Sequence, residues 1–149
     1  MSDDTRGVAE RITRLFAAQR FGVLATSGDP WPYATLVGLA VSDDLRSIVF
    51  VTNRATRKYD NIGRDPHVSI LVDDRRNRAT DFIEASALTA LGAAAETTGG
   101  EREEAAALYL ARHPHMSGFV AGEGAALVRV AVSRYILVSR FQEVVEWTP

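Results

Sequence analysis

Residues 51–61 read Val-Thr-Asn-Arg-Ala-Thr-Arg-Lys-Tyr-Asp-Asn, and the hydrophobic run Ser47–Val51 leads directly into them. The run predicts a β-strand that ends at Thr52 and Asn53, and the residues that follow predict a helix that begins near Thr56. At the start of a helix the first backbone N–H groups have no partner within the helix, and the helix dipole favours negative charge. The strand, the turn and the helix therefore form a candidate anion site.

Basic and hydroxyl side chains are concentrated in residues 52–58, which we call the basic turn: Thr52, Arg54, Thr56, Arg57 and Lys58. One interpretation is that these donors hold a phosphate monoester. The other is an ordinary helix start whose cations are either solvated or paired with Asp60 and Asp65, because each positive charge near a helix N-terminus costs about 0.3–1 kcal/mol and needs compensation. The residues alone leave both interpretations open.

Length, composition and charge exclude several classes of protein. With 149 residues, 46% of them hydrophobic and 24% charged, the chain predicts a single globular domain spanning residues 1–149. The net charge of −2 provides no basic field for nucleic acid. The absence of cysteine excludes disulfides and thiolate chemistry. No apolar run approaches the roughly 20 residues of a membrane span, and the N-terminal residues lack an apolar signal core, so we expect a cytoplasmic protein.

Short strands separated by turn residues predict an antiparallel meander rather than alternating strands and helices. Strands are expected at 21–26, 33–41, 47–52, 67–72, 80–96, 126–138 and 142–147, and helices at 3–19, 56–64 and 101–112. The fold class is therefore expected to be α+β, a small antiparallel barrel of about six or seven strands with two or three flanking helices.

Two of these strands carry finer expectations. The alanine-rich stretch 80–96 would also suit a helix by propensity, but its apolar residues follow no helical stripe, and Gly92 suits a β-bulge. We therefore expect one long, bent strand there. In the strand 126–138, alternation places one set of residues on a common face: Leu127, Arg129, Ala131, Ser133 and Tyr135.

The ordered set Phe50–Asn53, Thr56-Arg57-Lys58 and Asn61, followed by the strand Asp65–Val72, resembles the FMN-binding split barrels related to pyridoxamine 5'-phosphate oxidase. The resemblance favours the phosphate interpretation and implies a homodimer with the flavin at its interface. It implies a cofactor held by Val51, Thr52, Asn53, Thr56, Arg57, Lys58 and Asn61, with help from Arg54. The matching strand runs beneath the flavin ring in that family, which implies ring contacts from Tyr33, Ala34, Thr35 and Leu36.

The activity implied by the resemblance is that of a flavin-dependent oxidoreductase acting on an unidentified small molecule. Pyridoxamine-phosphate oxidation itself is not expected. The oxidases carry an Arg and a Lys where this chain has Tyr33 and Gly38, and they end with an Arg-x-His motif that residues 143–149 lack. No general acid or base can be named, and hydride transfer to a flavin does not always require one.

Other cofactors stay open. The stretch Tyr109–Pro114 resembles a segment of split-barrel proteins related to haem-utilisation factors, which implies a haem- or flavin-binding protein without turnover. Haem would require an axial ligand, for which the candidates are His67, His113 and His115. A deazaflavin (F420) or a longer flavin such as FAD would also present phosphate to the basic turn. The His113-x-His115 pair has no third ligand beside it in the sequence, so we expect no metal site.

Overall fold

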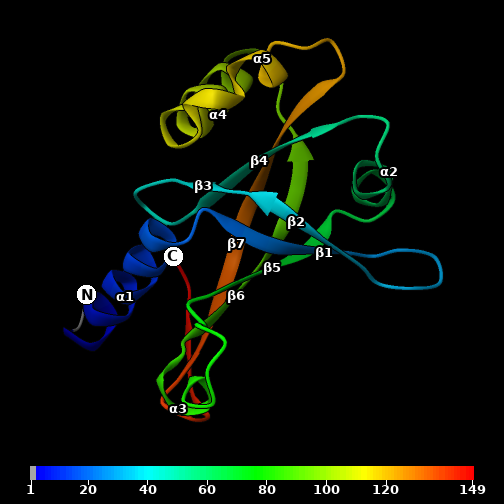
Figure 1. The fold of residues 1–149 in the computed structure, drawn as a ribbon. Coiled ribbons are helices and arrows are strands. Elements are labelled where there is room, and N and C mark those ends of the chain that lie inside the picture. Colours follow the sequence, from blue (N-terminus) through cyan, green and yellow to red (C-terminus); the bar gives the residue numbers. More distant parts are fainter. Residues whose placement is uncertain (1–2) are drawn as a thin grey trace.

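The computed structural model of the chain describes residues 3–149 (Figure 1). Within them, eight strands form one antiparallel sheet: β1 (Phe21–Thr26), β2 (Tyr33–Gly38), β3 (Ala40–Val41), β4 (Ser47–Asn53), β5 (His67–Asp73), β6 (Ala87–Glu96), β7 (Ala125–Ser139) and β8 (Glu143–Trp147). The helices are α1 (Asp3–Ala18), α2 (Arg57–Arg64), α3 (Asp81–Glu84), α4 (Gly99–Arg112), the 3-10 helix η1 (Pro114–Met116) and α5 (Ser117–Val120). The expected α+β class is confirmed, with more strands and more helices than expected.

The order of the strands explains why the sheet curls. It runs β2-β1-β5-β6-β7-β4-β3, and β8 pairs with the part of β7 that extends beyond β4. The two edge strands, β2 and β3, are separated only by Leu39, whose N–H donates to the Arg20 carbonyl at 2.9 Å. Because the first and last strands are neighbouring segments of the chain, the sheet must bend round until its edges meet. The result is a split barrel (Figure 1).

The helices close the open sides of this barrel. The apolar stripe of α1 places Ile12 and Phe16 in the main core, beside the fully buried Phe50 and Tyr135. Helix α2 buries Ile62 in the same core. Helix α4 packs on β3, β4 and β7 and forms a second, smaller core with them. None of the helices in residues 3–149 combines the length and the apolar character that crossing a membrane requires.

A β-bulge in β7 reverses the alternation that the sequence predicts. Leu91 pairs with Arg134 and Gly92 pairs with Val132, so Ser133 is an extra residue without a partner on β6. Ala131 and Ser133 are exposed on one face, whereas Tyr135 is fully buried on the other. The expectation that these residues share one face was therefore wrong for Tyr135, because one inserted residue moves every later side chain to the opposite face. The register shifts at Gly92, where a bulge was expected, but the extra residue lies on β7 and not on the strand of Gly92.

Two other expected elements are interrupted. The stretch 80–96 is not one strand, since the short helix α3 precedes β6. The Asp81 carboxylate accepts the backbone N–H groups of Arg76 and Arg78 at 3.0–3.1 Å, and this local bonding folds the segment into a compact loop. The expected strand 33–41 breaks at Leu39, where the chain passes from one edge of the sheet to the other.

Candidate functional site

The basic turn is shaped by Asn53, the last residue of β4. Its side-chain oxygen accepts the Ala55 N–H at 2.8 Å, and its carbonyl accepts the Thr56 hydroxyl at 2.8 Å. Thr56 is the N-cap of α2, but its side chain makes no capping hydrogen bond, because its hydroxyl is turned back to Asn53. The first N–H groups of α2 are therefore left open to an anion.

The three cations of the basic turn differ in their partners. Arg57 and Lys58 form no salt bridge with any residue between 3 and 149, and the Arg57 guanidinium lies 5.2 Å above the ring of Tyr33. Arg54 instead pairs with Glu96, Nη2 to Oε2 at 2.6 Å. Pairing of Arg57 or Lys58 with Asp60 or Asp65 is not observed within residues 3–149, since Asp65 bonds His67 at 2.8 Å, and the solvated helix start stays as the alternative to a bound phosphate. Two cations of the turn are thus available to a ligand.

Thr52 and Asn61 are buried rather than exposed at the turn. The Thr52 hydroxyl lies 3.0 Å from the Thr56 hydroxyl. The Asn61 amide donates to the Thr26 hydroxyl at 2.9 Å, and its oxygen accepts from Arg64 at 2.6 Å. Asn61 therefore fixes α2 to β1 and holds the guanidinium of Arg64 beside the site. No sequence motif marked Arg64 as a site residue, although it lies one helical turn after Asn61.

A small pocket of about 360 Å³ joins the basic turn to the β1–β2 loop. Its lining contains Tyr33, Arg57, Asn61 and Arg64 together with Gly28, Asp29, Trp31 and Pro32. Tyr33 and Arg57, two predicted cofactor contacts that lie far apart in the sequence, are thus in contact in the structure. Val51, by contrast, packs against the smaller core beneath α4.

The side chains of Tyr33–Leu36 on β2 point alternately to the two faces of the sheet. Ala34 pairs with Ala25 on the outer face of the barrel, and Leu36 pairs with Val23 on the same face. Tyr33 and Thr35 point the other way. Within residues 3–149, the Thr35 hydroxyl is the one buried side-chain polar atom without a hydrogen-bond partner. Side-chain contacts to a ligand on the outer face are available from Ala34 and Leu36, whereas Thr35 can offer only its backbone there.

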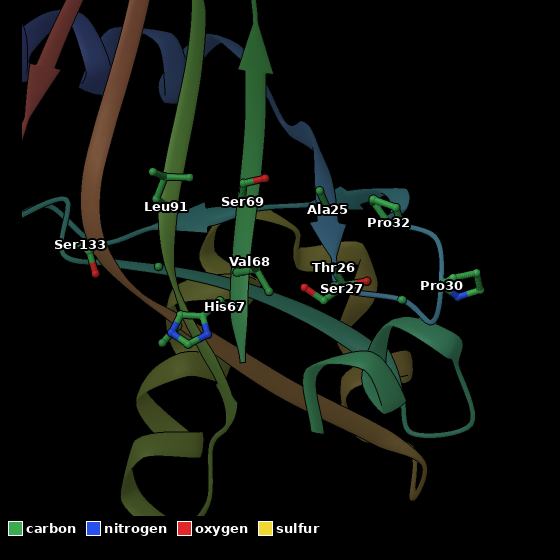
Figure 2. Close-up of a pocket in the computed structure, with 13 residues that line it drawn as sticks. Ala25, Thr26, Ser27, Pro30, Pro32, His67, Val68, Ser69, Leu91 and Ser133 are labelled. Atoms are coloured by element: carbon green, nitrogen blue, oxygen red, sulfur yellow. The ribbon is translucent and has the colours of Figure 1, made fainter. Parts of the chain in front are cut away.

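A larger pocket of about 760 Å³ lies on that outer face (Figure 2). Strands β1, β5, β6 and β7 and the loop after β1 supply its lining: Ala25, Thr26, Ser27, Gly28, Pro30, Pro32, His67, Val68, Ser69, Leu91, Gly92, Ala93 and Ser133. Gly28 and Pro32 also line the small pocket beside Arg57, so the two pockets are neighbours on either side of the β1–β2 loop. The volume is in the range of small-molecule sites. Only the pairing of distant strands reveals this lining, and no local motif marks it.

A second polar cluster lies on the other side of α2. The Tyr59 hydroxyl donates to Glu96 at 2.5 Å, and the same carboxylate accepts from Arg54. The hydrogen bond from Arg54 lowers the pKa of Glu96, while the bond to Glu96 raises the pKa of Tyr59. Glu96 is therefore held in its charged form, and it was not predicted as part of the site.

The three histidines occupy different environments. His113 is buried, with its Nε2 2.8 Å from the Leu39 carbonyl and its ring against Tyr109. His115 is exposed on the 3-10 helix. His67 is exposed on the wall of the outer pocket. Among the residues that the structure describes, no three potential ligands gather closely enough to hold a metal ion.

Comparison with known proteins identifies the fold and the family. No curated protein matches the chain. A heme binding protein from Mycobacterium smegmatis superposes with a TM-score of 0.82 at 20% identity, over 94% of this chain but only 57% of that one. ChuZ of Campylobacter jejuni gives a TM-score of 0.79 at 13% identity, over 96% and 60% of the two chains. An FAD-binding protein from Mesorhizobium loti gives 0.68 at 19% identity, over 87% and 90%.

Likeness at these identities shows the fold alone. The family is shown by the sequence itself, because the model of the family described as pyridoxamine 5'-phosphate oxidase matches residues 8–147. That match spans the basic turn and every strand of the barrel. The chain therefore belongs to the pyridoxamine 5'-phosphate oxidase family.

Proposed function

We propose that the protein binds FMN and uses it as a flavin-dependent oxidoreductase. One observation carries the proposal: within residues 3–149, Arg57 and Lys58 form no salt bridge, and they lie at the start of α2, where the N-cap side chain makes no hydrogen bond to the helix, next to the pocket on the outer face. A phosphate monoester carries about −1.5 to −2 charge at neutral pH, which these two cations balance. The family and an FAD-binding structural neighbour support a flavin over an unrelated phosphate ester.

The residues around the turn would divide the work of holding the cofactor. Arg57 and Lys58 would bind the phosphate, with the open N–H groups of α2 as further donors, while Thr52, Asn53, Thr56 and Asn61 shape the turn through their own hydrogen bonds. Ala34 and Leu36 would lie against the ring from β2, and Val51 would support the turn from beneath. A bound flavin supplies hydride transfer, so the protein need only bind, orient and exclude water.

Apolar side chains on the outer face suggest how the site is completed. Leu36 is 69% exposed and Phe21 is 55% exposed on β2 and β1, and Leu71 on β5 is 39% exposed. Antiparallel sheets with an apolar outer face usually bury it against another surface. We propose that a second copy of the chain covers this face, forming a homodimer that encloses the outer pocket from the side that the single chain leaves open.

The dimer is tested by placing a charge on this face. Leu36→Glu is expected to convert a dimer into a monomer in sedimentation-velocity experiments, because a carboxylate at the interface would have to be buried unpaired. Phe119→Glu is the matched control, since Phe119 is 45% exposed on α5, which packs over β7 on another side of the barrel. A Leu36→Glu protein that stays dimeric would place the interface elsewhere.

Haem is a second candidate, and one observation favours it. His67 is exposed on the wall of the outer pocket, and its Nδ1 bonds Asp65 so that Nε2 is the nitrogen that could approach an iron atom, whereas His113 is buried with its Nε2 bonded to Leu39. The heme binding protein from Mycobacterium smegmatis shares the fold. His67 would supply the axial ligand.

Titration of the purified protein separates the two candidates. We expect FMN to bind saturably, with quenching of its fluorescence, and we expect His67→Ala to leave this binding intact. Haem titration of the same two proteins is the second arm. No quenching by wild-type protein, together with a haem absorption band that His67→Ala abolishes, would reject the flavin proposal and support haem.

A further inference from the structure

A cavity of about 480 Å³ lies between α1, β3 and α4, and we call it the helix cavity. The two helices lie on the two sides of β3 (Figure 1). Among residues 3–149, none that lines the helix cavity also lines the outer pocket or the small pocket beside Arg57. Its volume is in the range of small-molecule sites. It is therefore a second candidate site, separate from the proposed flavin site.

Most of the lining of the helix cavity is apolar. Apolar side chains reach it from α1, from α4 and from the chain around β3: Phe16, Leu39, Ala40, Val41, Leu45 and Leu108. Val41 and Leu108 are only half-buried, so part of this apolar lining is in contact with water. An apolar group that fills the cavity would remove that surface from water, which favours binding in proportion to the area covered.

Two contacts of Leu39, the residue before β3, hold the walls of the cavity in place. Its carbonyl lies 2.8 Å from Nε2 of His113, which joins it to the end of α4. Its N–H donates to the Arg20 carbonyl at 2.9 Å, just after the end of α1. The cavity is thus held open between fixed elements, and a ligand would lose little affinity to the ordering of its walls.

Arg112 brings a positive charge to the lining. It is the last residue of α4, and its Nη2 donates to the carbonyls of Phe16 and Ala17 at 3.1 and 2.8 Å. Its Nε and Nη1 have no hydrogen-bond partner in the part of the chain that the structure describes, and the side chain forms no salt bridge there. The carbonyls at a helix end carry only a partial negative charge, about half a unit, so a net positive charge remains.

One carboxylate, that of Asp43, also lines the cavity. Asp43 is exposed, and it lines the neighbouring cavity along α1 as well, whereas Arg112 does not. Asp43 is therefore placed where the two cavities adjoin, and Arg112 is the charged group away from that junction. The two side chains form no salt bridge with each other.

We propose that the helix cavity binds a small carboxylic acid with an apolar tail: the carboxylate accepts a hydrogen bond from Arg112, and the tail lies against the apolar lining. A carboxylate matches a cation that has unused donors, and a tail matches walls that are apolar and already in place. This site does not rest on the proposed flavin function.

The proposal is tested with three probes of equal chain length, octanoate, 1-octanol and octylammonium, titrated into the protein by isothermal calorimetry at neutral pH. Octanoate is expected to bind about tenfold more tightly than 1-octanol, because only the carboxylate gains a charge-assisted hydrogen bond. Octylammonium is expected to bind most weakly. Between butanoate and octanoate, each added methylene is expected to tighten binding about fourfold, as for burial of apolar surface.

Variants separate a binding role of Arg112 from a structural one. Arg112→Gln is expected to weaken octanoate binding about tenfold and to leave 1-octanol binding unchanged, whereas Arg112→Lys retains part of the preference for the acid. Arg20→Gln is the matched control, since Arg20 is an exposed cation near the same end of α1 that does not line the cavity. Asp43→Asn is expected to leave octanoate binding unchanged or to tighten it, because it removes a like charge.

A variant that blocks the cavity locates the site. Ala111 lines the cavity from an exposed position on α4, so Ala111→Trp is expected to fold and to abolish the binding of both octanoate and 1-octanol. Melting curves check the folding of each variant. Equal affinity of wild-type protein for octanoate and 1-octanol, equal losses of both in Arg112→Gln, or full binding by Ala111→Trp would overturn the proposal. FMN titration of the same proteins is expected to give unchanged affinities, so failure of either site is seen separately.

Discussion

Replacing Gly92 with alanine is expected to lower the free energy of unfolding by about 3 kcal/mol, the upper part of the range for overpacked positions. A Cβ at this position would clash with the carbonyl oxygen of Ala131 and would lie 2.8 Å from Cγ1 of Val130. The strand that carries these atoms cannot retreat, because Ala131 is paired with β6 on one side and with Ser47 of β4 on the other. The close approach at the bulge requires a residue without a side chain.

In a domain of this size the loss corresponds to a melting temperature lower by about 6–12 °C, measurable by calorimetry or circular dichroism. Gly7→Ala and Gly63→Ala are matched controls, since both residues lie in helices and a Cβ at either meets nothing within 4 Å. Each control is expected to gain about 0.5–1 kcal/mol from the better helix propensity of alanine. A Gly92→Ala protein as stable as the wild type would mean that the bulge can move to another residue.

The same bulge shows where sequence patterns succeed and where they stop. The hydrophobic runs and turn residues correctly predicted an antiparallel barrel, because strand length and apolar spacing are local properties. Gly92 indicated where along the sheet the bulge lies, because a glycine within a strand is also a local signal. The inserted residue, Ser133, lies on the neighbouring strand, and nothing in its own surroundings marks it. Register depends on both strands at once, so Tyr135 was assigned to the wrong face.

The candidate site divides in a similar way. The basic turn was evident from the sequence, because its residues are contiguous and a strand followed by a helix start has a known electrostatic character. The partner of Arg54 was not, since Glu96 reaches it only through the pairing of β6 with β7 and of β7 with β4. The outer pocket was also not visible, because four strands and a loop contribute to it. Sequence patterns alone therefore did not predict the contacts between segments that lie far apart along the chain.

Replacing both Arg57 and Lys58 with glutamine is expected to weaken FMN binding by about 100-fold or more. Each cation would make a charge-assisted hydrogen bond to the phosphate, and losing one such bond costs about 1.5–3 kcal/mol, or at least about tenfold in affinity. The dissociation constants would be measured by quenching of flavin fluorescence. Arg14→Gln is the control, since Arg14 is an exposed cation on α1, at another part of the barrel (Figure 1).

Stability is expected to change in the opposite direction. A positive charge in the first turn of a helix opposes the helix dipole by about 0.3–1 kcal/mol, and neither Arg57 nor Lys58 has a salt bridge within residues 3–149. The cation–π contact of Arg57 with Tyr33, about 0.5–1 kcal/mol, offsets only part of the cost of the two charges. The double variant without ligand should therefore melt at the wild-type temperature or slightly above it. A variant that loses both binding and stability would show that the two cations support the fold. Loss of binding with stability retained would show that the basic turn keeps an electrostatically unfavourable helix start because an anion completes it.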